Sequence, residues 1–122
     1  MFHLKRTPEA LFLVSALFAG SAYAETLKIA YIDPLSGGFA NVGDAGLKQF
    51  QFVADDINKR NLTGGPKIEI VPFDNKVSPQ ESLNVLKKVI DQGIRVITHG
   101  NSSGVAGVLI DAVNKHNERN PD

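Results

Sequence analysis

The sequence contains no cysteine, and this absence excludes several kinds of chemistry at once. Disulfides, thiolate metal sites and a cysteine nucleophile are all ruled out, so stability must come from a buried core. The histidines are His3, His99 and His116, and they do not have the spacing of metal ligands. We therefore expect no metal site and no cofactor.

The sequence also has no net charge, because its 13 lysines and arginines are balanced by 13 aspartates and glutamates. Without residues 1–24, which are considered below, 12 acidic side chains remain against 11 basic ones, since Glu9, Lys5 and Arg6 fall in that segment. A near-neutral chain without a basic cluster gains little counterion-release energy on nucleic acid and has no polybasic stretch for anionic lipid. Neither nucleic acid nor a membrane surface is expected as a partner.

The first 24 residues have the three parts of a secretory signal peptide. A basic start with Lys5 and Arg6 precedes an apolar run over residues 10–19, and Ala22 and Ala24 are the small residues that signal peptidase recognises. The run has about half of the ~20 residues that a membrane-spanning helix needs. We predict cleavage before Glu25 and a periplasmic mature protein, with an uncleaved membrane tether as the alternative.

Strand and helix patterns alternate in the remaining sequence, residues 25–122. Residues 27–32 are rich in large aliphatic side chains and predict a buried strand, followed by a glycine-rich loop over residues 33–43. Asp44 is then expected to cap a helix whose apolar face consists of Leu47, Phe50, Val53, Ala54 and Ile57. Phe52 falls outside this face, so either a loop covers it or it contacts a partner.

Two further strand and helix pairs follow. Residues 67–73 predict a strand that contains Pro72, which places it at a sheet edge. Ser78, Pro79 and Glu81 are typical of a helix start, and this helix should end near Gly93. Residues 94–98 predict a third strand, and residues 99–103 turn into a last helix. The expected inward-facing residues of these helices are Leu83, Leu86, Val89, Ile90, Val105, Val108, Leu109, Ala112 and Val113.

This order predicts an α/β fold, a three-layer doubly wound parallel sheet with strand order 2-1-3. The first and third strands are then neighbours whose connections go to opposite faces, which is where open parallel sheets bind ligands. Residues 33–43 and 99–104 would flank that crevice. Because the third strand would have one open edge, we expect at least one more strand after residue 122 and treat residues 25–122 as an incomplete lobe.

The loop after the third strand has the composition of an anion site. Asn101, Ser102 and Ser103 precede a helix whose first amides can bind a carboxylate. The alternative is that one serine merely caps the helix. The loop after the first strand adds the hydroxyl of Ser36 and the ring of Phe39, which either lines a pocket or covers the core.

Residues 100–104 also fit the G-x-S-x-G nucleophile elbow, which makes a secreted serine hydrolase with Ser102 as its nucleophile the main rival. Such an enzyme needs an acid and a histidine from later strand ends. Asp111 and His116 lie along the helix that leaves the elbow, and His99 precedes the serine, so we expect no enzyme. A dinucleotide site is disfavoured because the first loop lacks G-x-G-x-x-G.

Taken together, the motifs of residues 25–122 closely resemble the amino-terminal lobe of type 1 periplasmic solute-binding proteins, in particular the leucine/isoleucine/valine-binding branch that serves ABC importers. The motifs that carry this resemblance are Asp33-Pro34-Leu35-Ser36-Gly37, Val42-Gly43-Asp44, Asp55-Asp56-Ile57-Asn58, Gly64-Gly65, Lys67-Ile68-Glu69-Ile70 with Asp74, and Asn101-Ser102-Ser103-Gly104.

That family has two doubly wound lobes that close on a ligand. The resemblance implies that Ser102 contacts the ligand carboxylate, that Ser103 and the helix amides lie nearby, and that Phe39 and Val42 face the ligand side chain. It further implies a monomer at full length that delivers a small amino acid or organic acid to ABC permease subunits, or a sensor subunit of the same fold. Amino-acid binders often have an aromatic ring where Val42 stands, so an aromatic acid is as admissible as leucine.

Overall fold

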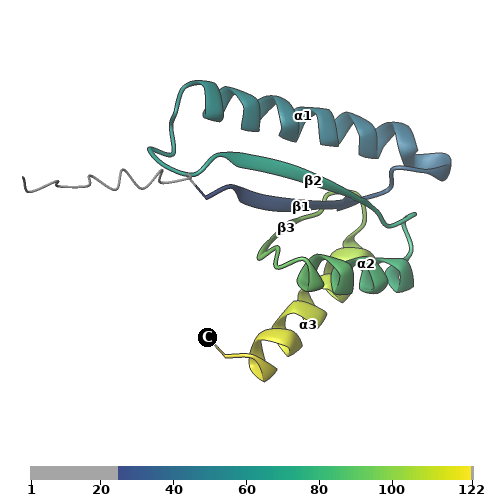
Figure 1. Cartoon of the computed structure of the whole chain (residues 1–122). Coiled ribbons are helices and arrows are strands. Elements are labelled where there is room, and N and C mark those ends of the chain that lie inside the picture. Colours follow the sequence, from purple (N-terminus) through teal and green to yellow (C-terminus); the bar gives the residue numbers. More distant parts are fainter. Residues whose placement is uncertain (1–24, 122) are drawn as a thin grey trace, which may run out of the picture.

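The computed structural model describes residues 25–121, and the signal peptide predicted for residues 1–24 lies outside the described residues. The predicted alternation of strands and helices is confirmed (Figure 1). The elements are β1 (Leu27–Asp33), a 3-10 turn η1 (Gly37–Phe39), α1 (Ala40–Lys59), β2 (Ile68–Asp74), α2 (Pro79–Asp91), β3 (Val96–Thr98) and α3 (Ser103–Arg119). No helix in the described range is long and apolar enough to cross a membrane.

The three strands form one parallel sheet in the order β2-β1-β3, as predicted. Helix α1 lies on one face of the sheet, and α2 and α3 lie on the other, which gives the three layers (Figure 1). Pro72 is on the edge strand β2, where its missing amide hydrogen is tolerated. Within residues 25–121, no strand pairs with the outer edge of β3.

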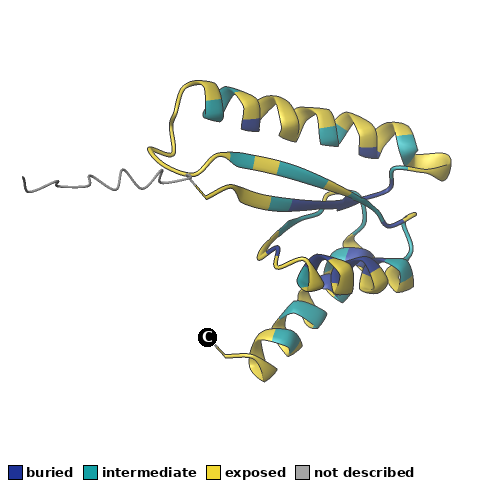
Figure 2. Ribbon diagram, in the orientation of Figure 1, coloured by how far each residue is buried: buried dark blue, intermediate teal, exposed yellow. Residues whose placement is uncertain are grey.

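The core lies between the sheet and the two helices α2 and α3. Buried residues concentrate in β1 and α2 (Figure 2). Burying one large aliphatic side chain contributes roughly 1.5–3 kcal/mol, so this cluster is the main source of stability. Its members are Ala30, Ile32, Val85, Leu86, Val89, Ile94, Val105 and Leu109.

The start of α2 agrees with the sequence pattern. Ser78 Oγ accepts a hydrogen bond from the Glu81 amide at 3.2 Å, and Pro79 is the first helical residue. After the helix, Gly93 has a φ of +72°, a conformation that favours glycine. Strand β3 is shorter than the predicted range of residues 94–98, because it begins only at Val96. Ile94 precedes the strand and is nevertheless buried.

The predicted start of α1 was wrong. The helix begins at Ala40, because η1 forms a first turn that runs directly into it, and the cap position is held by Phe39. Asp44 lies inside the helix instead, where its carboxylate pairs with Lys48 at 2.6 Å. The glycine-rich loop is consequently shorter than residues 33–43.

The inward faces also differ in part from the prediction. Leu83 is exposed and Val85 is buried, so the apolar face of α2 is rotated toward Val85. Helix α1 packs mainly over β2. Its flank with Phe50 and Val53 is therefore exposed, and no described element covers Phe52, which is 75% exposed.

Candidate functional site

The two predicted turns lie at the same edge of the sheet. Strands β1 and β3 are parallel neighbours, so the segments that follow Asp33 and Thr98 leave from the same end. The first of these segments leads to Phe39 and Val42, and the second leads to Asn101, Ser102 and Ser103. The structure thus brings the predicted residues to one rim of the sheet.

Asp33 joins the two turns. Its side chain is 1% exposed. Its Oδ1 accepts from the backbone amide of Asn101 at 3.1 Å, and its Oδ2 accepts from Asn101 Nδ2 at 2.8 Å. A buried carboxylate is costly unless it is hydrogen-bonded, and these bonds meet that need. The Asn101 amide group is therefore used to anchor its own turn to β1.

His99 completes this connection, whereas from the sequence we considered it only as a metal ligand or as the histidine of a hydrolase. Its Nδ1 lies 2.7 Å from the carbonyl oxygen of Ile32 and 3.1 Å from Asp33 Oδ1. Its Nε2 lies 3.0 Å from the carbonyl oxygen of Ser102. The only feature of the sequence that pointed to this contact is that Asp33 and His99 follow strands that were predicted to be neighbours.

Ser102 is the N-cap residue of α3. Its Oγ accepts from the Val105 amide at 3.3 Å, and its carbonyl oxygen accepts from the Ala106 amide at 2.8 Å. A capping hydroxyl keeps its proton, so Ser102 can still donate to a ligand. The amides of Ser103 and Gly104 are the first of the helix and have no intrahelical acceptor. Ser103 is exposed, so the tip of α3 is open to solvent.

Ser36 is held by the end of β2. Its hydroxyl donates to the carboxylate of Asp74, which also accepts from the amides of Leu35 and Lys76, each at 2.9 Å. Although burial alone would raise the pKa of Asp74, these hydrogen bonds and the Lys76 charge hold that pKa below its usual value. A ligand contact by Ser36 stays a prediction.

Phe39 and Val42 are exposed at the start of α1, with fractions of 57% and 45%. The helix start is held close to β1 because Gly43 has no side chain. An added Cβ there would lie 1.7 Å from the carbonyl oxygen of Pro34. Tyr31 Oη also donates to the Gly43 carbonyl at 2.9 Å. Burial, followed by the neighbouring Asp33 carboxylate, raises the pKa of Tyr31.

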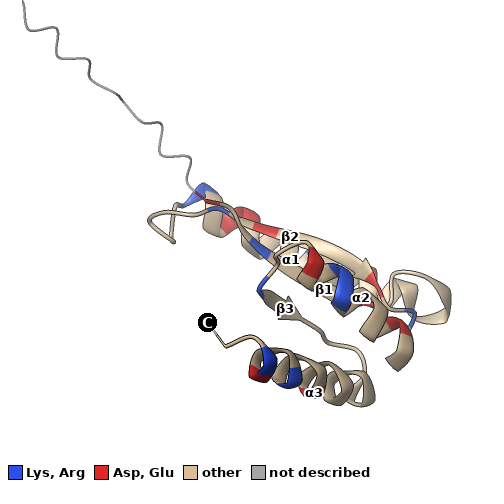
Figure 3. Ribbon diagram, turned by 60° about the horizontal axis from the view of Figure 1, so that its bottom comes forward, with Lys and Arg blue, Asp and Glu red and all other residues tan. Residues whose placement is uncertain are grey.

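The tip of α3 carries no formal charge. The lysine, arginine and acidic residues of this helix all lie in its second half, as Figure 3 shows. An anion at the tip would therefore be bound by backbone amides and hydroxyls rather than by a countercharge.

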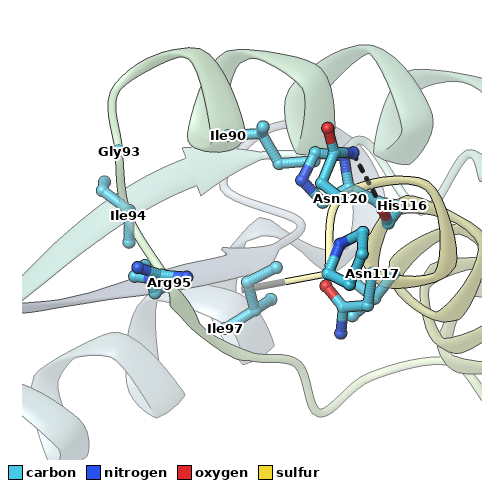
Figure 4. Close-up of a pocket in the computed structure, with 10 residues that line it drawn as sticks. Ile90, Gly93, Ile94, Arg95, Ile97, His116, Asn117 and Asn120 are labelled. Carbon is cyan, nitrogen blue, oxygen red and sulfur yellow. Dashed lines mark hydrogen bonds between the residues drawn. The ribbon is translucent and has the colours of Figure 1, made fainter.

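A separate hollow lies at the other end of β3. Ile94 and Arg95 line it together with the last turn of α3, where Asn120 Nδ2 donates to the carbonyl of His116 at 2.8 Å (Figure 4). None of the predicted site residues lines this hollow.

The residues of the hydrolase hypothesis do not assemble. The His99 ring faces the backbone oxygen of Ser102, and Asp111 pairs with Lys115 at 2.7 Å. His116 lies at the far end of α3, beside Asn120. Among residues 25–121, no group of three histidine or acidic side chains could hold a metal ion.

The family model described as periplasmic binding protein matches residues 26–118. This chain belongs to the periplasmic binding protein family. It is 36% identical over 102 residues to the Leu/Ile/Val-binding protein homolog 4 of Brucella abortus, a match covering 84% of this chain and 24% of that protein. It is 33% identical over 84 residues to the Leu/Ile/Val-binding protein of Escherichia coli, covering 69% of this chain and 23% of that protein.

A solved structure agrees with this assignment. The leucine-, isoleucine-, valine-, threonine- and alanine-binding protein from Brucella ovis, in a closed conformation, matches with a TM-score of 0.73 and 36% identity. The match covers 80% of this chain and 25% of that one. The chain thus spans about a quarter of the length of the curated relatives it matches. These relatives are solute-binding proteins, which disfavours the hydrolase hypothesis.

Proposed function

We propose that this chain is the amino-terminal part of the extracytoplasmic solute-binding component of an ABC importer. It would capture a small amino acid or organic carboxylate between two lobes and perform no chemistry. The single observation that carries this proposal is the open tip of α3 at the same rim as exposed Phe39 and Val42. The 36% identity to a Leu/Ile/Val-binding protein homolog supports it.

The ligand would lie across the rim with its carboxylate at the tip of α3. The Ser102 hydroxyl and the amides of Ser103 and Gly104 would donate to the carboxylate, at roughly 1.5–3 kcal/mol for each charge-assisted bond. Phe39 and Val42 would contact its apolar part. Asn101 would keep the turn on β1 through Asp33.

The route to this function begins with export. Residues 1–24 would direct the chain to the periplasm and be removed there. The full-length protein would act as a monomer and deliver its ligand to ABC permease subunits in the inner membrane.

A ligand screen on the full-length protein tests this proposal. Thermal-shift measurements with leucine, isoleucine, valine, benzoate and octanoate would identify a ligand, and calorimetry would give its affinity. We expect Ser102→Ala to weaken binding by about 1.5–3 kcal/mol, because one charge-assisted hydrogen bond is lost.

Ser78→Ala is the matched control. Ser78 caps α2 as Ser102 caps α3, each accepting from the amide three residues later. Both variants should lose a similar amount of stability, about 1 kcal/mol. Only Ser102→Ala should lose affinity. Unchanged affinity in Ser102→Ala would remove Ser102 from the site, and covalent labelling of Ser102 by a fluorophosphonate would instead support the hydrolase.

A further inference from the structure

The ring of His99 is enclosed between β1 and the start of α3. Its side chain is 8% exposed. Nδ1 faces the carbonyl oxygen of Ile32 and the carboxylate of Asp33, and Nε2 faces the carbonyl oxygen of Ser102. All three neighbouring atoms are acceptors, so the ring can contact them favourably only as a donor: a neutral ring donates from one nitrogen, and a ring with a proton on each nitrogen donates from both.

The carbonyl that His99 faces also begins the hydrogen-bonding of α3. Ser102 O accepts from the Ala106 amide at 2.8 Å, and Ser102 Oγ accepts from the Val105 amide at 3.3 Å. The residue before it, Asn101, is bonded twice to Asp33. Two successive residues of the turn are therefore tied to the end of β1, one by His99 and one by Asp33.

We propose that His99 is a positioning residue for the anion-binding tip of α3. This inference rests on the proposed function. By donating from Nε2, the ring holds the Ser102 carbonyl at the end of β1, so the Ser102 hydroxyl and the first amides of α3 are already oriented before a ligand arrives. If the hydrogen-bond donors had to become ordered during binding, the free energy of that ordering would weaken the affinity. Donors that are already ordered avoid this cost.

If His99 served only the stability of the fold, its replacement would lower the stability of the whole protein. The tip of α3 and the core would then lose order to the same extent. A positioning role predicts loss of order confined to the start of α3. Amide hydrogen exchange separates the two, because it reports local and global opening residue by residue.

The experiment compares three variants of the full-length protein without ligand. His99→Leu removes every hydrogen bond that the ring can donate, His99→Gln keeps a side-chain N–H donor, and His116→Leu is the matched control at the far end of α3. In His99→Leu we expect the Val105 and Ala106 amides to exchange about tenfold faster, while Leu86 and Val89 in α2 change by less than about twofold. His99→Gln should restore part of the protection, and His116→Leu should leave both sets unchanged.

A second measurement connects the order of the tip to binding. Calorimetry with L-leucine and with benzoate should show about tenfold weaker binding in His99→Leu than in wild type, with an intermediate value in His99→Gln. The proposal is overturned by unchanged exchange at Val105 and Ala106, by equal acceleration in α2, or by faster exchange with unaltered affinity. If wild type binds none of the five compounds of the ligand screen, that result counts against the proposed function, and the exchange measurement still decides the role of His99.

Discussion

Gly43→Ala is the sharpest test of how α1 is placed against the site. An added Cβ would lie 1.7 Å from the carbonyl oxygen of Pro34 and 2.7 Å from its carbonyl carbon. Both atoms belong to the backbone, and Pro34 is itself fully buried. No side chain can rotate away, so the start of α1 must shift away from the end of β1.

The magnitude follows from three contributions. Alanine in place of glycine inside a helix favours folding by about 1 kcal/mol. Forcing extra volume into a packed contact costs about 1–3 kcal/mol. The hydrogen bond from Tyr31 Oη to the Gly43 carbonyl, which a shift would break, contributes about 0.5–1.5 kcal/mol. We therefore expect a net loss of about 0.5–3.5 kcal/mol, because the second and third contributions outweigh the first.

Urea denaturation followed by circular dichroism measures this change, with Gly107→Ala as the matched control. Gly107 is also in a helix, but nothing lies within 4 Å of its added Cβ. That variant should gain about 0.5–1 kcal/mol. If Gly43→Ala were as stable as wild type, or gained stability as Gly107→Ala should, the close contact between α1 and Pro34 would be refuted.

Two predictions concern pH. The folded pKa of Asp74 is depressed, so its contribution to stability is present above the unfolded value near 3.8 and is lost as the pH falls through the folded value. Acid denaturation should therefore be less steep in Asp74→Asn, and identical profiles would contradict this assignment. The folded pKa of Tyr31 is raised, so its contribution is present below the unfolded value of 10.0 and is lost at more alkaline pH. The difference in tyrosinate absorbance between wild type and Tyr31→Phe reports this residue, and its ionisation at the ordinary tyrosine pH in the folded protein would disprove its burial.

Much of the fold was predictable because local chemistry determines it. Pro72 can lie only where an amide hydrogen is not needed, and this placed β2 at the edge. Ser78 and Pro79, followed by Glu81, form a pattern that is typical of a helix start. The start of α1 was missed because Asp44 is an equally good cap on local grounds. The turn over Gly37–Phe39, which begins the helix earlier, has no such marker.

For the candidate site, the sequence predicted the two turns that lie at one rim of the sheet but not the contacts that join them. Its frame depends on Asp33, which bonds to Asn101 across 68 positions of sequence, and no local pattern reports a pair so far apart. Leu83 and Val85 show the same limit, because the rotation of α2 is decided by α3 and β1, which pack against it. The helical period alone accommodates either residue in the core.

The backbone contact between Gly43 and Pro34 fixes the position of the start of α1 without using the side chains that this helix exposes at the rim. Phe39 and Val42 flank that contact with their side chains outside it. If Phe39 and Val42 contact the ligand as proposed, replacing their side chains should alter which molecules bind without displacing the helix that presents them. Such a division would let selectivity diverge among descendants of one scaffold, and it gives a protein engineer two exposed positions for retuning a biosensor.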